Sequence, residues 1–298
     1  MVLIAGVSVN RAHIAIADFA QRILAEDTLA LDIGQGPVPV LDAITTRLAE
    51  LSQTTAMAGA PLQAMVIGLP GPVDPGHGRP VRPPIMPGWD DFPVATHLSA
   101  SVKCRVIVEN DANIRALGEA RAVPEDQLPM VYLTIGAGIG HIRVPRADDV
   151  VCVCGNVGCV EAVASTSAIL RQLSEQHTCL ASHSQPTLMN SHNSCDRAAS
   201  VVRMIRKAAI EVGEAVAMLV HVFNPKRIVI GGPSLKPAMT CLAGICSVVY
   251  QRAHPLATRN LMIGNSSLGE SAGLADALSP DGVAGIYLRA HCTPSSAG

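Results

Sequence analysis

A histidine followed by a tight group of three cysteines constrains the fold of this chain more than any other feature of its sequence. His141 lies a short distance before the segment Cys152-Val-Cys-Gly-Asn-Val-Gly-Cys159. Thiolates and imidazole are preferred ligands of zinc, and four of them complete a tetrahedral structural site. Gly155 and Gly158 permit the tight turns that bring nearby cysteines onto one ion. The pattern predicts a metal-stapled loop, and the alternative is three buried free cysteines with an unrelated histidine. The predicted ligands are His141, Cys152, Cys154 and Cys159.

The composition is that of an ordinary globular protein and excludes several classes. Apolar residues make up 49% and charged residues 15% of the 298 positions, which is unlike a disordered chain. The 22 basic and 24 acidic residues leave a net charge of −2, so no polybasic footprint for nucleic acid is present. Nine cysteines, an odd number that includes a Cys-x-Cys, fit a secreted disulfide framework poorly. No apolar run reaches the roughly 18 residues that span a bilayer, and the start lacks the basic flank of a signal peptide. We therefore expect a cytoplasmic protein without membrane contact.

Short apolar runs alternate along the chain with segments of helical periodicity. The patterns predict strands at 2–9, 13–18, 65–69, 105–108, 130–135 and 227–230. Helices are expected at 38–51, 161–176, 196–223 and 235–253. Two further helices are expected, one that ends at 102 and one that begins at 110 or 111. The Pro- and Gly-rich residues 70–93 are typical of a long ordered loop. This alternation predicts an α/β architecture, and the length favours two domains.

Two carboxylates, Asp111 and Glu161, are candidates for contact with the hydroxyl groups of a sugar. Asp111 lies in Glu109-Asn-Asp-Ala-Asn113, at the end of a predicted strand, where α/β folds place ligands. There Asp111 would take a proton from a sugar hydroxyl while Asn110 hydrogen-bonds its neighbour. Both residue types are equally common as helix N-caps. Glu161, two residues after the last cysteine, would be held against sugar hydroxyls by the metal loop. Alternatively, Glu161 is only a charge that favours the start of a helix.

Two glycine-rich turns follow predicted strands. Gly136-Ala-Gly-Ile-Gly140 follows the strand at 130–135, and Gly231-Gly232 follows the strand at 227–230. Backbone N–H groups in such turns form anion nests suited to phosphates. Glycine also simply ends strands, so each turn by itself is weak evidence for a nucleotide site.

Together these segments resemble the ROK family (repressor, open reading frame, kinase), which includes bacterial glucokinases, N-acetylmannosamine kinases and sugar-responsive repressors. The similarity covers nearly the whole chain, and the cysteine loop with its following glutamate is its most specific part. The resemblance implies an actin-like ATPase (ribonuclease H-like) fold of two domains, expected at 1–112 and 113–298, with a sugar in the cleft. The further matching segments are Gly68-Leu-Pro-Gly-Pro-Val-Asp74, Pro87-Gly-Trp89, Asn224-Pro-Lys-Arg-Ile-Val-Ile-Gly-Gly232 and Leu268-Gly-Glu270.

The family's functional residues carry over to the matching positions. In a kinase Asp111 would be the catalytic base, and structural zinc would bind to His141 and the three cysteines. ATP with Mg²⁺ is implied only if the chain is a kinase, and assembly into homodimers or tetramers is common in the family. The implied sugar ligands are Gly71, Asn110, Asp111, His141 and Glu161. The implied nucleotide-binding residues are Gly136, Gly138, Gly231 and Gly232.

The chain departs from the family pattern in three places. The family's first phosphate loop, Asp-x-Gly-Gly-Thr-Lys, aligns with Ser8-Val-Asn-Arg-Ala-His13, which lacks the magnesium-binding aspartate and both glycines. The replacing side chains either block the phosphates or strain the turn by roughly 1 kcal/mol each. A strand and loop that normally precede the zinc histidine are missing, since Gly138-Ile-Gly140 runs directly into His141. Either the second domain is trimmed or the chain derives from a damaged gene. Gly138 replaces an acidic sugar ligand, and Ile85 replaces an asparagine of the sugar loop.

Three readings of the function follow. The first is a regulator that senses a sugar or sugar phosphate without converting it, and the damaged phosphate loop beside a retained sugar site favours it. Family repressors carry an N-terminal winged helix, so we expect DNA binding only through a segment absent from this chain. The second is an ATP-dependent kinase of glucose or N-acetylmannosamine type, and the third is an inactive relative.

Overall fold

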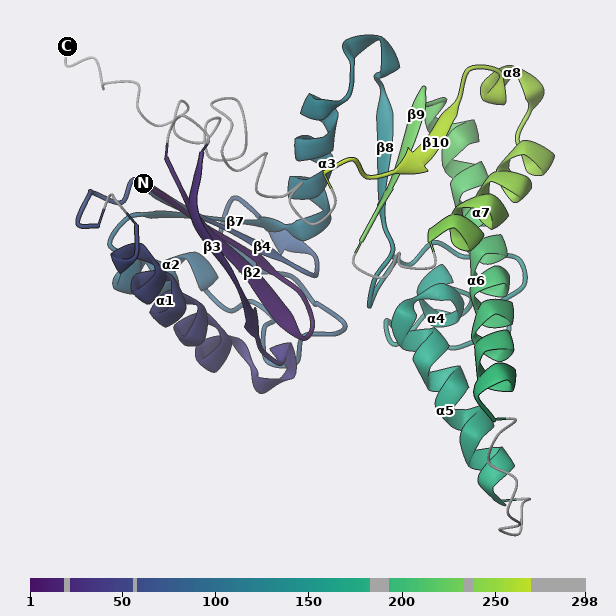
Figure 1. The fold of residues 1–298 in the computed structure, drawn as a ribbon, viewed down its shortest axis with the longest axis horizontal. Coiled ribbons are helices and arrows are strands. Elements are labelled where there is room, and N and C mark those ends of the chain that lie inside the picture. The colour runs from purple at the N-terminus through teal and green to yellow at the C-terminus, as the bar shows by residue number, and fades with distance from the viewer. Residues whose placement is uncertain (19–21, 56–57, 183–192, 233–237, 269–298) are drawn as a thin grey trace. The chain divides into compact units, whose positions relative to one another are not determined.

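The computed structural model describes every residue except 19–21, 56–57, 183–192, 233–237 and 269–298 (Figure 1). The described residues form two compact units, Met1–Val123 and residues 124–268. The division at 112/113 stays a prediction, and helix α3 (Asp111–Ala122) lies wholly in the first unit. The matching segment at Gly269 and Glu270 lies outside the described residues.

The first unit is a five-stranded sheet with the strand order β3-β2-β1-β4-β7. Strands β1, β2 and β3 pair antiparallel, whereas β4 and β7 run parallel to β1. Helix α1 buries one apolar stripe because Val40, Ile44 and Leu48 recur at helical spacing. The bounds are β1 (Val2–Val7), β2 (Arg11–Ala17), β3 (Ile23–Ala30), η1 (Ile33–Gln35), α1 (Pro37–Gln53), β4 (Ala64–Leu69), α2 (Val94–Val102) and β7 (Arg105–Asn110). A short hairpin, β5 (Val73–Asp74) and β6 (Arg79–Pro80), forms within the predicted loop at 70–93.

The second unit has a three-stranded sheet, entirely parallel, with the order β10-β9-β8. Strands β8, β9 and β10 therefore repeat the parallel succession of β1, β4 and β7. Within the described residues of this unit, nothing corresponds to the antiparallel pair β2 and β3. The bounds are η2 (Glu125–Gln127), β8 (Met130–Thr134), α4 (Val160–Ala164), α5 (Thr166–Ser182), α6 (Asn193–Phe223), β9 (Arg227–Gly231), α7 (Ala238–Arg252), α8 (Pro255–Thr258) and β10 (Met262–Asn265).

The structure confirms most predicted elements, adds two strands and corrects one predicted helix. The sequence patterns did not predict the edge strands β3 and β10. One helix over 161–176 was also wrong, because Ser165 interrupts it in an extended conformation between α4 and α5. The Ser165 hydroxyl then accepts a hydrogen bond from the backbone N–H of Ala168 and caps the second helix. The start of the helix predicted at 235–253 falls partly on residues 233–237, outside the described part of the chain.

Among the described helices, none combines the length and apolar character needed to cross a bilayer.

Candidate functional site

In the first unit, the predicted sugar residues gather at the carboxyl ends of two parallel strands. The last residues of β4 and β7, Leu69 and Asn110, are register partners, so the loop after β4 lies beside the start of α3. The Asn110 side chain accepts hydrogen bonds from the backbone N–H groups of Ala112 and Asn113, at 2.9 and 3.2 Å. Its Nδ2 donates to the carbonyl of Gly71 at 2.7 Å. The N-cap interpretation of Asn110 is therefore confirmed.

Gly71 has a packing reason to be glycine. A Cβ atom at this position would lie 3.0 Å from Cβ of Pro83 and 3.2 Å from Sδ of Met86. Such distances are tighter than ordinary contact, so a side chain would push the loop away from Asn110. The backbone that Asn110 holds is thus fixed by neighbours on both sides.

Asp111, the first residue of α3, has the properties of a general base working near neutral pH. Burial raises the pKa of its carboxyl group from 3.8 to about 6, and nearby Arg115 acts in the opposite direction. The Arg115 Nε lies 3.9 Å from the Asp111 carboxylate, one helical turn away. A carboxylate with this pKa is ionised at neutral pH yet retains useful basicity.

Arg115 is a residue of this site that sequence reasoning missed. It is only 8% exposed, and its buried Nη1 has no hydrogen-bond partner among the residues that the structure describes. The available signal was the spacing, since a cation four residues after Asp111 lies on the same face of the helix.

In the second unit, short antiparallel bridges close the predicted metal loop. Arg143 pairs with Cys159 and Val151 with Val157. Gly155 and Gly158 have φ angles of 88° and 85°, which confirms that the loop needs glycines at its turns. A Cβ atom at Gly158 would also lie 3.1 Å from the Arg143 side chain.

The four predicted metal ligands converge. One donor atom from each of His141, Cys152, Cys154 and Cys159 lies within 4.8 Å of all the others. The sulfurs of Cys154 and Cys159 are 3.7 Å apart, and Nδ1 of His141 is 3.4 Å from the Cys152 sulfur. Two sulfurs on one tetrahedral zinc, each at about 2.3 Å, are separated by about 3.8 Å. The donor set and its spacing therefore fit a structural zinc ion.

The pKa values of the cysteines in this cluster are shifted in different directions. Burial raises the pKa of the Cys159 thiol to about 12. The backbone N–H of Asn156 lowers the pKa of Cys154. A bound cation would favour the thiolate form of all three cysteines, including the buried Cys152 and Cys159.

Glu161 occupies the glycine turn that was expected to receive phosphate. Its Oε2 accepts hydrogen bonds from the backbone N–H groups of Ile139 and Gly140, at 2.5 and 3.0 Å. The N–H of Gly136 donates to the carbonyl of Gly138 within the turn. Three of the five N–H groups of residues 136–140 are therefore already used inside the protein.

Packing explains why Gly231 and Gly232, in the second glycine-rich turn, are glycines. Gly232 has a φ of 121°, and a Cβ atom there would lie 2.1 Å from the carbonyl oxygen of Ile135. A Cβ atom at Gly231 would collide with the Tyr132 side chain. Because Thr134 and Gly231 are register partners, this pair and the turn at 136–140 follow neighbouring strand ends.

The first loop of the chain forms a tight hairpin turn between β1 and β2. The N–H of Ser8 donates to the carbonyl of Arg11 at 2.8 Å. Neither Asn10 nor Arg11 has a positive φ, so the expected alternative of turn strain does not apply. The two replacing residues instead add side chains at the turn.

The predicted site residues thus form two groups, one in each unit. Gly71, Asn110 and Asp111 belong to the first, and the second contains the metal loop, Glu161 and the glycine turns.

Known proteins resemble this chain in both sequence and fold. The model of the ROK family matches residues 7–141 and 137–279, and the two matches overlap where the glycine turn runs into His141. A putative xylose repressor of Caldicellulosiruptor sp. is 26% identical over 279 residues, covering 82% of this chain and 69% of the relative. A glucokinase of Halalkalibacterium halodurans is 31% identical over 219 residues, covering 63% of this chain and 66% of the relative.

A solved structure gives the same result for the fold. It is a ROK family glucokinase from Streptomyces griseus in complex with glucose and AMPPNP, with a TM-score of 0.72 and 23% identity. The alignment covers 92% of this chain and 96% of that one, so the mixed α/β fold is of the actin-like kind. With nearly its whole length matched, this chain belongs to the ROK family.

Proposed function

We propose that this chain is a regulator-type ROK protein that binds a sugar or sugar phosphate and does not phosphorylate it. Both repressors and glucokinases occur among its relatives, so the family alone leaves the choice open. The proposal rests mainly on Glu161, whose carboxylate takes the Ile139 and Gly140 N–H groups of the glycine turn. A nest that already holds a buried carboxylate is poorly suited to a nucleotide phosphate, because like charges repel in a desolvated place.

The first loop supports the same proposal. Phosphoryl transfer depends on positioning and on neutralising the phosphate charge. Ser8 supplies no carboxylate for magnesium, and Asn10 and Arg11 carry side chains where the family pattern has glycines. This loop therefore lacks groups with which the family pattern binds magnesium and phosphate, and its departure supports the proposal independently of Glu161.

Each unit offers polar groups that could bind a sugar. Asp111 offers a carboxylate, and the loop at Gly71 is fixed by Asn110. His141 is exposed, which suits a residue that contacts both metal and sugar. Glu161 as a further sugar ligand is compatible with its bonds to the turn only through its other carboxylate oxygen.

A kinase is the second candidate, and the pKa of about 6 at Asp111 favours it. A coupled assay of ADP release over hexoses and N-acetylhexosamines decides between the two. We expect no sugar-dependent release from the wild-type chain. Turnover that falls by about 10² to 10⁴ in Asp111→Asn, and not in the exposed control Asp126→Asn, would overturn the regulator proposal.

Sugar binding itself needs a separate measurement. The same sugars and their 6-phosphates should raise the unfolding temperature of the wild-type chain, because a ligand that binds only the folded state stabilises it. This shift should shrink in Asp111→Asn. No stabilisation by any of them would favour the inactive relative.

We also propose that the metal loop holds one structural zinc ion, bound by His141, Cys152, Cys154 and Cys159. Metal analysis of the purified protein should find about one zinc per chain. The content should fall in Cys154→Ser and stay unchanged in Cys104→Ser, which alters a cysteine of the first unit. A stable, zinc-free wild-type protein would contradict the proposal.

A further inference from the structure

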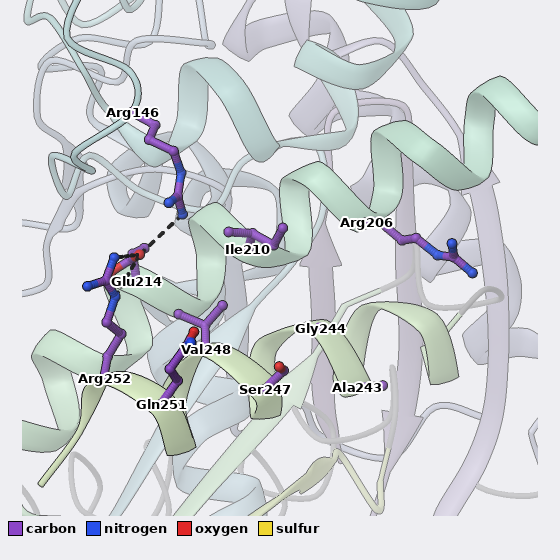
Figure 2. A pocket seen from close by; sticks show the side chains of 10 residues that line it. All are labelled: Arg146, Arg206, Ile210, Glu214, Ala243, Gly244, Ser247, Val248, Gln251 and Arg252. Atoms are coloured by element: carbon purple, nitrogen blue, oxygen red, sulfur yellow. Dashed lines mark hydrogen bonds and ion pairs between the residues drawn. The ribbon is translucent and has the colours of Figure 1, made fainter.

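A groove of about 710 Å³ runs between helices α6 and α7 in the second unit (Figure 2). On α6 it is lined by Arg206, Ile210 and Glu214, which follow one another at intervals of four residues and so share one face. Residues from 243 to 252 of α7 form the opposite wall, and Arg146 of the metal loop closes one end. A cavity of this size matches those that hold small molecules.

Glycines set the spacing of the two helices beside the groove. A Cβ atom at Gly213 would lie 2.7 Å from Cβ of Val248, and one at Gly244 would lie 2.7 Å from Cβ of Ala209. The helices therefore touch along this line and cannot slide closer to fill the groove. Ile210 and Val248 give it an apolar floor.

One end of the groove carries more hydrogen-bond donors than acceptors. A single oxygen of Glu214, Oε1, accepts from Arg146 Nη2 at 3.2 Å and from Nε and Nη2 of Arg252 at 3.2 and 3.1 Å. Arg146 Nε donates in addition to Glu211 at 2.9 Å. Each guanidinium has five N–H donors, so several on Arg146 and Arg252 remain for a ligand.

Arg206 supplies a positive charge toward the other end. No ion pair or hydrogen bond joins its guanidinium to any residue in the described part of the chain, and Figure 2 shows it pointing away from the Glu214 cluster. Eight residues separate it from Glu214 on α6, or about 12 Å along the helix axis. Ser247 and Gln251 place further polar groups between the two ends.

We propose that this groove binds a small organic anion, a sugar-sized molecule whose phosphate or carboxylate group pairs with Arg206. The acceptor-rich body of the molecule would meet the spare donors of Arg146 and Arg252, and its less polar face would lie on Ile210 and Val248. Planar guanidinium groups suit both anions because they bind two oxygens at once. This site is separate from the residues around Asp111 and does not depend on the sugar proposal.

The test is calorimetric titration of the full chain with glucose 6-phosphate, gluconate, glucose and inorganic phosphate. We expect glucose 6-phosphate or gluconate to bind and glucose to bind at this site far more weakly, and the comparison distinguishes phosphate from carboxylate. Arg206→Glu should weaken binding by at least about tenfold, since it removes a charged hydrogen-bond partner. Arg203→Glu is the matched control, because Arg203 lies on the same helix outside the groove lining.

Two further measurements keep this result distinct from sugar binding around Asp111. Binding that survives in Asp111→Asn and is lost in Arg206→Glu supports the groove. Binding of the anion that is unchanged in Arg206→Glu would overturn it, and so would anion binding to Asp111→Asn that is no stronger than the binding of glucose to the same variant. Sedimentation of the wild type and of the Arg206→Glu and Arg203→Glu variants tests whether the groove is a contact between two copies of the chain. A dimer that dissociates only in Arg206→Glu, together with no binding of the anion, would show such a contact and overturn the proposal.

Discussion

In each unit, one acidic side chain determines how much negative charge the candidate site residues hold in a poorly solvated place. In the first unit this residue is Asp111, whose carboxyl group has a pKa of about 6 instead of 3.8 because it is desolvated. The folded chain therefore holds this proton more tightly than the unfolded chain does. The resulting stabilisation is complete below pH 3.8 and is lost as the pH rises through about 6.

Asp111→Asn should remove this pH dependence. The variant cannot ionise, so it should unfold much like the wild type below pH 4 and should be more stable at pH 8. A shift of roughly two pKa units sets an upper limit of about 3 kcal/mol on the gain. Denaturant unfolding at several pH values measures it, with Asp126→Asn as an exposed control. Equal stability of wild type and Asp111→Asn at pH 8 would show that the carboxylate is better solvated than its burial suggests.

Glu161 is the corresponding residue of the second unit. Replacing it by alanine leaves the N–H groups of Ile139 and Gly140 without their partner, so Glu161→Ala should lower the free energy of unfolding by about 2–3 kcal/mol. Glu161→Gln keeps an acceptor oxygen, so its free energy of unfolding should fall less than that of Glu161→Ala. The control is Glu175→Ala, an exposed glutamate of α5. Faster amide exchange at Ile139 and Gly140 in the alanine variant would identify the cause, and unchanged stability would count against this role.

At the scale of elements, Arg146 ties the metal loop to helix α6. It bonds Glu211, whose side chain is only 3% exposed, and Glu214. Arg146→Met removes a positive charge from beside these two acids and should lower the free energy of unfolding by about 2–3 kcal/mol. The loss should be smaller than for a fully buried ion pair because Arg146 is half exposed. Arg143→Met is a control in the same loop, since Arg143 and its partner Asp148 are both exposed and the pair should contribute under about 1 kcal/mol. If adding Glu211→Gln to Arg146→Met restores part of the lost stability, the pairing is confirmed. Equal losses of stability in Arg146→Met and Arg143→Met would contradict it.

The elements that sequence reasoning missed share a physical reason. Strand β3 reads Ile-Leu-Ala-Glu-Asp-Thr-Leu-Ala and lies at a sheet edge, where its side chains are largely exposed or half-buried. An edge strand needs no apolar alternation, so its pattern is weak. Strand β10 is another edge strand, short and containing glycine and asparagine. Buried strands such as β4, in contrast, are predictable because every residue is apolar or glycine.

The candidate site was predictable where chemistry depends on local spacing. The cysteines and their glycines needed only neighbouring residues, and the structure brings them together as expected. The contact of Glu161 with the glycine turn was not predictable, because it joins Glu161 to Ile139, 22 residues earlier, and depends on how the chain folds between them. The ion cluster on α6 did leave a signal, since Glu211 and Glu214 interrupt the apolar stretch at 208–223 of that helix and a buried acid needs a cation.

At the scale of the whole molecule, each unit has a hydrophobic core of its own. The large cluster of the first unit is built on β1, β2, β4 and α1, and it includes the buried Trp89. The core of the second unit joins β9, α6 and α7 to Val144 and Ala147 of the metal loop and to Val160 of α4. Only the second core therefore depends on the loop that the metal would hold.

Removing the metal should consequently destabilise one unit and spare the other. Binding of structural zinc contributes on the order of 10 kcal/mol to folding, which is as large as the stability of a typical domain. Treatment with a chelator should therefore abolish slow amide exchange over residues 124–268 and leave it over β1, β4 and α1. Hydrogen exchange followed by mass spectrometry resolves the two segments, and Cys154→Ser should reproduce the effect without chelator. Equal loss of protection in both units would mean that they fold as one cooperative body, and unchanged protection in the second would mean that its core of valines and alanines is sufficient without metal.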